Sequence, residues 1–313
     1  MNKPIYILGI NESHTASAAL LKDGEIIASA QEERFTRKKL QAGIPKNAIK
    51  FCLAFAQISA FDIDLVAVSD IEPPFLPPFE SPYHKFKPPL PLLLLLLLNL
   101  EEKLEALFPI TKKLLILLYK LLISLQLFKR QRERLKNLNE VIRIGRENYV
   151  FIPHHTSHAA SALFSSPQTS SKKTSLVFTC DGVGDFESAT ISKYHMGKFK
   201  KLVSIDFSQS IGFFYQHVTQ FLGFKPIEDE YKVMGLAPYT NTKNARRVYK
   251  ILKRFFKIDK EKNSWKMTIS EYHLWHKLPR LIGYKRFDHI AHAVQIITEE
   301  ILTEWVENAI KKF

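Results

Sequence analysis

The chain has 313 residues, of which 46% are hydrophobic and 12% aromatic. Apolar residues at this level exclude a globally disordered chain, and the length suggests about two domains. The two cysteines, Cys52 and Cys180, are too few for a disulfide framework and indicate a reducing compartment.

The N-terminus and the net charge bear on location and partners. The first residues, MNKPIYILGINESH, predict a strand and a polar loop without the apolar core of a signal peptide, so we expect a cytoplasmic protein. The net charge is +14, with basic residues concentrated in 111–146 and 241–286. Nucleic acid or an anionic membrane would fit this charge. We favour solvated helix faces that attract phosphorylated substrates; nucleic acid is not expected, and peripheral membrane contact stays open.

Three strands are predicted at the start of the chain. An apolar run covers 4–10, and Asp23-Gly24 separates two further apolar runs at 18–22 and 25–30. Asp-Gly between such runs predicts a two-residue hairpin, because a type I′ turn needs positive φ at both positions. Beyond the hairpin, a helix is predicted after Pro45 and a buried strand at 65–69.

The next region has an unusual composition. Residues 71–91 are proline-rich and predict a linker or loop. Seven leucines follow at 92–98, and further along a Leu-rich helix carries one polar stripe, made of Lys113, Lys120, Ser124 and Gln131. A bilayer span needs about 20 apolar residues, and charges interrupt these runs sooner. We expect a helical insert at about 90–147 that packs on itself or a partner; an interfacial helix and a transmembrane hairpin are the alternatives.

A similar opening recurs about 170 residues later in the chain. The apolar run at 176–180 leads into Asp181-Gly182-Val183-Gly184, and two strands are predicted around Gly197. The repeated strand, Gly-bearing loop and hairpin suggest two homologous α/β halves. We expect each half to place a hairpin loop at a shared cleft. Backbone N–H groups of such loops point at anions, which would suit phosphates.

Three histidines form the sharpest cluster. His154, His155 and His158 follow a predicted strand at 149–152, and His154 and His158 are one turn apart if 156 onward is helical. Two imidazoles at this spacing can share a metal ion, and Asp181 can add a carboxylate. Such a set suits Fe(II), Mn or Zn. Histidines of the core and a plain Asx turn at Asp181 are the alternative interpretation.

Two other polar segments are weaker signals. In the loop at 11–17, small and hydroxyl residues would let a phosphate approach, and His14 could act as donor or general base. A simple polar turn is the alternative. The charge run at 32–39 is most often a solvated face. The segment 228–239 fits a tight loop and a helix start near a ligand, or no site at all.

Taken together and in order, five segments resemble the NodU-type O-carbamoyltransferases. They are GINESHTASAALLKDGEIIASAQEERFTRKK, HHTSHAASALFSSP, DGVGD, SIGFFYQHVTQFLGF and EYKVMGLAPY. The resemblance covers 5–39, 150–239 and 288–302, about half of the chain, and leaves out the Leu-rich insert.

The resemblance implies a fold and an activity. The fold would be α/β, of the two-lobed actin/Hsp70 (ASKHA) ATPase type. Its first lobe would cover 1–171, complete and with the insert, and its second lobe would cover 172–313. The activity would be ATP-dependent transfer of a carbamoyl group from carbamoyl phosphate, through carbamoyl adenylate, to a hydroxyl of a small-molecule or sugar acceptor. A separate YrdC-like C-terminal domain would make the adenylate.

It also implies roles for single residues. His154, His158 and Asp181 would bind a divalent metal, with Fe(II) preferred. His14 would be the histidine of the first phosphate loop, and Lys39 lies near a basic position of the family; these two would be catalytic. The loop residues that would bind the cofactor, ATP, are Ser13, Ser17, Gly182 and Gly184.

Two departures from the family pattern shape a further expectation. Thr15 stands where the family commonly has Asp, and the chain ends after a helix whose apolar stripe is Ile290, Val294, Ile297, Ile301 and Trp305. The family's Gly-Gly…Asn nucleotide loop, a second metal-binding Asp and the YrdC-like domain would follow that helix. We therefore expect an N-terminal fragment with an incomplete second lobe, inactive alone. A tRNA threonylcarbamoyl-transfer module and an inactive or membrane-associated remnant are the alternatives.

Overall fold

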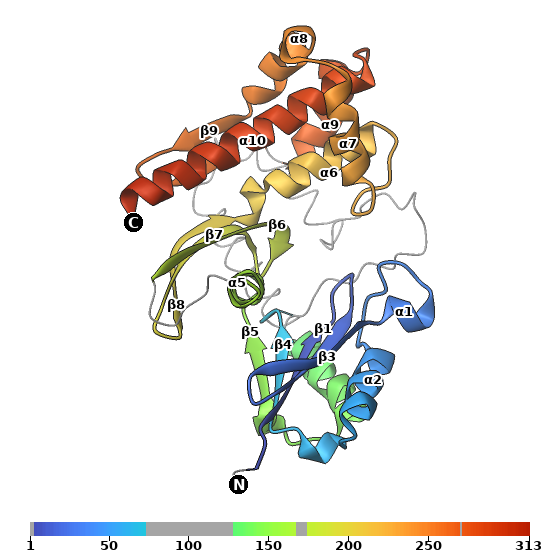
Figure 1. Cartoon of the computed structure of the whole chain (residues 1–313). Helices are drawn as coiled ribbons and strands as arrows, with labels where there is room; N and C mark the ends of the chain where they lie inside the picture. Colours follow the sequence, from blue (N-terminus) through green and yellow to red (C-terminus); the bar gives the residue numbers. More distant parts are fainter. Residues whose placement is uncertain (1–2, 73–127, 167–173, 270) are drawn as a thin grey trace, which may run out of the picture. The chain divides into compact units, whose positions relative to one another are not determined.

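The computed structural model describes residues 3–72, 128–166, 174–269 and 271–313. The chain is a mixed α/β protein, as predicted, and it divides into two compact units, Met1–Ile152 and Pro153–Phe313 (Figure 1). The predicted boundary at 171/172 would place the helix after Pro153 in the first lobe. In the structure this helix contacts strands of the second unit instead. The two-lobed ATPase fold stays a prediction.

The first unit is built on a five-stranded sheet in the order β3-β2-β1-β4-β5. The first three strands are antiparallel neighbours, whereas β4 runs parallel to β1 and to β5. The predicted hairpin is confirmed, with φ of 51° at Asp23 and 89° at Gly24. The strands are β1 Tyr6–Asn11, β2 Ser17–Lys22, β3 Glu25–Gln31, β4 Leu65–Ser69 and β5 Tyr149–Ile152.

Helices cover this sheet and complete its core. The predicted helix after Pro45 is α2 (Lys46–Ala56), which packs on β2 and β3. Residues 128–142 are also helical, and Leu138 and Ile142 are fully buried in the same core. The short elements of the unit are α1 Glu33–Thr36, η1 Ala60–Asp62 and η2 Arg146–Asn148.

The described residues include part of the predicted insert. The end of that region, 128–142, is helical as expected and belongs to the core of the first unit. The leucine run at 92–98 and most of the polar stripe lie outside the described residues. Within the described ranges, no helix has both the length and the apolar character needed to cross a membrane.

The second unit contains the predicted second antiparallel meander. Its strands are β6 Ser175–Gly184, β7 Glu187–His195 and β8 Lys198–Asp206, joined by two-residue turns at 185–186 and 196–197. β6 does not end at Cys180 as predicted. It continues to Gly184 with a shift of register after Cys180, so that Asp181 lies in an irregular stretch of the strand. A two-stranded sheet of β9 (Phe256–Asp259) and β10 (Ser264–Met267) follows.

Helices form most of the remaining core of this unit. The predicted apolar stripe of α10 (Phe287–Lys312) is confirmed, because Ile290, Val294, Ile297, Ile301 and Trp305 are all buried. The Trp305 ring meets Phe178 of β6 edge-on at 5.4 Å, which ties α10 to the meander. The other helices are α5 His154–Phe164, η3 Phe207–Gln209, α6 Ile211–Phe221, α7 Glu230–Leu236, η4 Ala237–Tyr239, α8 Thr242–Lys253 and α9 Glu271–Ile282.

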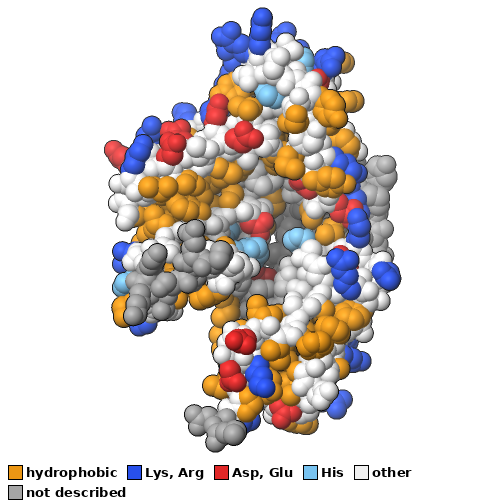
Figure 2. All heavy atoms as spheres, viewed as in Figure 1, with side chains coloured by type: hydrophobic (Ala, Val, Ile, Leu, Met, Phe, Trp, Pro, Cys, Tyr) orange, Lys and Arg blue, Asp and Glu red, His pale blue; other side chains and the backbone are white. Residues whose placement is uncertain are grey.

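One basic segment of the sequence is an exposed helix face. The exposed side chains of α8 include Lys243, Arg246, Arg247 and Lys250. Lys and Arg side chains gather over this helix at the top of Figure 2. The buried face of α8 is apolar, with Ala245, Val248 and Leu252 in the core. This arrangement agrees with the interpretation of solvated helix faces, and the partners of the charge stay predictions.

Candidate metal centre

The helix that carries the histidines begins earlier than predicted. α5 starts at His154, directly after Pro153, and not at Thr156. His154 and His158 are therefore both helical and one turn apart, so their side chains project from the same face. The backbone N–H of His154 donates to Asp185 Oδ2 at 2.7 Å, which holds the start of the helix against the β6–β7 turn.

Three side chains of the second unit converge on one point. His154 Nε2 lies 2.8 Å from Asp181 Oδ2, His158 Nε2 lies 3.3 Å from the same oxygen, and the two Nε2 atoms are 3.0 Å apart. In the described part of the chain, these three residues form the group whose nitrogen and oxygen atoms could hold a metal ion. The predicted convergence is confirmed.

The three distances between His154 Nε2, His158 Nε2 and Asp181 Oδ2 test whether a metal ion would fit. With ligand bonds of about 2.1 Å, neighbouring ligand atoms are about 3.0 Å apart on an octahedron and about 3.4 Å apart on a tetrahedron. The observed edges of 2.8, 3.0 and 3.3 Å therefore match one face of an octahedron better. Three ligands on one face leave the opposite face for water or substrate. The donor set fits a divalent ion.

Electrostatics keep Asp181 charged. Burial alone would raise its pKa, but hydrogen bonds with His154, His158 and the Gly182 N–H outweigh burial and hold the pKa of Asp181 well below its usual range. The Gly182 N–H donates to Oδ1 at 2.6 Å. The side chains of His158 and Asp181 are 52% and 39% exposed, and that of His154 is 15% exposed. The cluster is therefore anchored at His154 and open to solvent at His158.

His155 has a different role from its two neighbours. It is buried, and its Nδ1 lies 2.9 Å from Thr179 Oγ1, which in turn lies 2.7 Å from Thr190 Oγ1. Burial lowers the pKa of His155, so the neutral ring is favoured. This histidine links α5 to β6 and β7 as a core residue, the alternative interpretation that the sequence left open.

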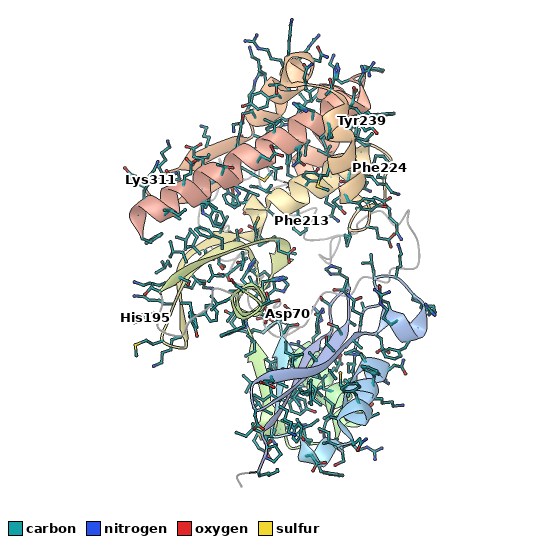
Figure 3. The ribbon with its side chains drawn as sticks, in the orientation of Figure 1. Asp70, His195, Phe213, Phe224, Tyr239 and Lys311 are labelled. Atoms are coloured by element: carbon teal, nitrogen blue, oxygen red, sulfur yellow. The ribbon has the colours of Figure 1, made fainter. Side chains whose placement is uncertain are left out.

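The two predicted loop glycines differ in how much space surrounds them. Gly184 is buried against the His154 ring, and an added β-carbon would come within 2.0 Å of it. At Gly182 the N–H is used by Asp181, and an added β-carbon would meet only Phe213, at 3.7 Å. Figure 3 labels Phe213 on α6. The sequence did not single out Gly212 of α6. A β-carbon added there would lie 2.9 Å from the Gly182 Cα, so this contact between α6 and β6 needs a glycine. Phosphate binding by Gly182 and Gly184 stays a prediction.

The predicted phosphate loop of the first unit is ordered by Asn11. Its Oδ1 accepts from the Ser13 N–H at 3.0 Å, from Ser13 Oγ at 2.8 Å and from Ser69 Oγ at 3.2 Å. Its amide donates to the Thr15 carbonyl. Ser17 begins β2, and His14 is exposed at the tip of the loop. The loop is thus a shaped turn with His14 facing solvent, and the roles of His14, Ser13 and Ser17 stay predictions.

A buried ion pair also holds this loop in place through Glu12. Glu12 and Arg134 are both buried, and Arg134 Nε donates to Glu12 Oε2 at 2.5 Å. Arg134 also donates to the carbonyls of Ser69, the last residue of β4, and of Asp70, which follows it. Figure 3 labels Asp70. The sequence did not indicate this pair, because its partners are 122 residues apart and Arg134 lay in the predicted insert.

The charge run at 32–39 is only partly a solvated face. Glu32 is buried, and its carboxylate accepts from the backbone N–H groups of Asn47 and Ala48, which caps the start of α2. Lys39 is exposed, as a solvated residue would be. The structure thus gives Glu32 a structural role, and a catalytic role for Lys39 stays a prediction.

The fold and the site define a class of protein: a mixed α/β chain with a cluster of two histidines and one carboxylate suited to a divalent metal. Residues 6–313 match the family model of the carbamoyltransferase N-terminus. The chain therefore belongs to the carbamoyltransferase family, an enzyme family of transferases, as the resemblance predicted.

Individual proteins are also similar to this chain in sequence. The chain is 32% identical over 241 residues to the protein sll1178 of Synechocystis sp., covering 76% of this chain and 35% of the relative. It is 30% identical over 226 residues to the nodulation protein NolNO of Sinorhizobium fredii, covering 72% and 28%. It thus spans about a third of the length of these curated relatives. Among solved structures, component A of the (R)-2-hydroxyglutaryl-CoA dehydratase of Acidaminococcus fermentans is similar with 14% identity and a TM-score of 0.43, over 96% of this chain and 77% of that one.

Proposed function

We propose that this chain provides the metal-binding part of an ATP-dependent O-carbamoyltransferase of the two-lobed actin/Hsp70 ATPase type. The carbamoyl group would come from carbamoyl phosphate, through carbamoyl adenylate, and pass to a hydroxyl of a small-molecule or sugar acceptor. Family membership supports the reaction class. The two antiparallel meanders, β1-β2-β3 and β6-β7-β8, support the doubled architecture.

The observation that carries the proposal is the triangle of ligand atoms. His154 Nε2, His158 Nε2 and Asp181 Oδ2 lie at the mutual spacing of three ligands on one octahedral face. Two imidazoles and one carboxylate with open positions are typical of non-haem Fe(II) sites. We therefore propose Fe(II) as the preferred ion, with Mn and Zn as competitors. A bound ion would supply Lewis-acid polarisation of a carbonyl or phosphoryl oxygen.

The protein's own side chains would set the charge and orientation of the site. Asp181 is deprotonated at neutral pH, which supplies one negative charge, and the two imidazoles bind as neutral ligands. His154 is held by Gly184 and Asp185, whereas His158 is on the solvent side. The substrate would therefore approach from the side of His158 and Asp181.

We also propose that the Asn11–Ser17 loop binds a phosphate group, with His14 as donor. Asn11 and the buried Glu12–Arg134 pair hold the loop in a fixed shape before any ligand arrives. The Ser13 N–H is already used within the loop, whereas the exposed His14 imidazole can reach an anion. A fixed loop lowers the ordering cost of binding.

The test is a metal titration of the full chain without oxygen. Co(II), which gives visible absorption bands, and Fe(II) should each bind with a stoichiometry of one ion per chain. The His158→Ala variant should lose this binding. His195→Ala is the matched control, because His195 ends β7 at the other end of the sheet from Asp181. Carbamoyl phosphate should then shift the Co(II) bands. A wild-type chain that binds no ion, or a loss in both variants, would contradict the metal centre.

A further inference from the structure

The start of α5 is capped by a residue from another element. The first N–H groups of a helix have no acceptor within the helix. Pro153, which precedes α5, provides no side-chain cap. In its place, the Asp185 carboxylate accepts the N–H of His154 at 2.7 Å. A carboxylate at this position is stabilised by the hydrogen bond and by the helix dipole.

The turn that carries Asp185 has a defined shape. Asp185 and Phe186 are the two central residues of the β6–β7 turn, and both have positive φ, 50° and 64°. This is the geometry of a tight hairpin turn, and it is uncommon for a bulky residue such as Phe186. The Phe186 ring packs edge-on against Phe207 at 6.1 Å, and its carbonyl accepts the Phe207 N–H. Asp185 is therefore presented by a fixed turn.

The same end of the hairpin contacts His154 at three places. Asp181 bonds its Nε2, Gly184 lies against the face of its ring, and Asp185 bonds its backbone N–H. One contact fixes the start of the helix and two fix the imidazole. The Asp185 bond thus holds the start of α5 at the end of the hairpin where His154 meets Asp181.

We infer that Asp185 is a positioning residue of the metal centre: by capping α5 at His154, it sets where the first imidazole meets Asp181. The inference rests on the metal centre proposed above. Asp185 acts through the helix end: its Oδ2 accepts the His154 N–H, and the ligand group found among the described residues consists of His154, His158 and Asp181. An asparagine would preserve the cap, because its side-chain oxygen accepts the same bond, whereas an alanine would remove it.

The experiment compares Co(II) affinity in three variants of the full chain. Asp185→Ala should raise the Kd about 10-fold or more, the range for loss of a group that orients a ligand. Asp185→Asn should restore affinity to within about three-fold of wild type, because the cap persists. Asn241→Ala removes the cap of α8, where Asn241 Oδ1 accepts the Asn244 N–H, and should lower thermal stability without changing the Kd.

A metal-free measurement separates the two proposals. Amide hydrogen exchange at His154 should speed up in Asp185→Ala and stay slow in Asp185→Asn. If wild type binds Co(II) and Asp185→Ala binds it equally well, the positioning role is wrong and the metal centre stands. If Asp185→Asn loses as much affinity as Asp185→Ala, the charge or direct ligation matters and the inference is overturned. If wild type binds no Co(II), the metal centre itself fails, and Asp185 is a helix cap only.

Discussion

A β-carbon built on Gly184 would lie 2.0 Å from Cγ of the His154 imidazole. Real contacts of this kind are nearly twice as long, so the ring rests directly on the glycine. We predict that Gly184→Ala displaces the His154 ring, weakens metal binding by about 10-fold or more, and costs about 1–3 kcal/mol of unfolding free energy through overpacking. Co(II) titration and urea unfolding measure the two effects.

Gly182→Ala is the matched control for that prediction. It lies two residues away in the same strand, but its added β-carbon would be 3.7 Å from Phe213, an ordinary contact. Metal affinity in this variant should stay near wild type. Equal losses in both variants would mean that the strand needs glycine for another reason, such as backbone contact with a phosphate, and would contradict the ring-support explanation.

The three histidines of α5 should respond differently to substitution. His158→Ala removes an exposed ligand, so metal affinity should fall by about 100-fold or more while stability changes by about 0.5 kcal/mol or less. His155→Ala removes the buried partner of Thr179, so stability should fall by about 1–3 kcal/mol. Metal titration of each variant, at a temperature where it is folded, checks the contrast. The reverse pattern would show that His155 and not His158 is the ligand.

Metal binding should depend on pH through the imidazoles alone. The pKa of Asp181 is held below its ordinary 3.8, so the stability it provides is present above that pH and is lost only as pH falls through the lower folded pKa. Between about pH 5 and 8, histidine is the side chain that changes charge. At the acid end, protons compete with the metal ion for the imidazole nitrogens, so the Kd should rise as pH falls. Co(II) titrations across this range give the slope, and a slope of three protons would mean that Asp181 also takes one up.

Local signals in the sequence predicted most of the elements. Asp23-Gly24 predicted the first hairpin, because its turn chemistry acts within two residues, and the spacing of Ile290 through Trp305 predicted the buried face of α10. The helical spacing of His154 and His158, together with the family resemblance, predicted the convergence with Asp181. These features depend on short-range geometry or on a known pattern.

Features that depend on distant contacts were missed. Glu32 belongs to a charge run in the sequence, yet its carboxylate caps α2. Arg134 lies in the predicted insert, yet it bonds Glu12, 122 residues away in the sequence. Asp185 belonged to a recognised motif, but its bond to His154 depends on how β6 and α5 pack. No periodicity or spacing reports such pairs, because they arise only when separate elements meet.

The buried pair of Glu12 and Arg134 leads to the last prediction. Removing one partner of a buried ion pair leaves an uncompensated charge, which costs about 3–5 kcal/mol. Arg134→Met should therefore destabilise the first unit strongly. Adding Glu12→Gln to that variant should recover part of the loss, because the buried carboxylate is gone. Hydrogen exchange of the β1 and β4 peptides reports on this unit. Tryptophan fluorescence is the internal control, since all three tryptophans lie in the second unit.

The loss of stability in Arg134→Met should also depend on pH, and the direction of that dependence identifies its cause. Burial raises the pKa of Glu12 above its ordinary 4.5, and the attraction of Arg134 opposes that rise, so the pKa should rise further without Arg134. A carboxyl with a raised folded pKa favours the folded state at low pH and loses that contribution as pH rises through the folded pKa. The loss of unfolding free energy in Arg134→Met should therefore be larger at pH 7 than near pH 4.5. The opposite result would be a loss of unfolding free energy that is equal at both pH values and unchanged by Glu12→Gln. It would show that Arg134 stabilises the unit through its bonds to the Ser69 and Asp70 carbonyls and not through Glu12.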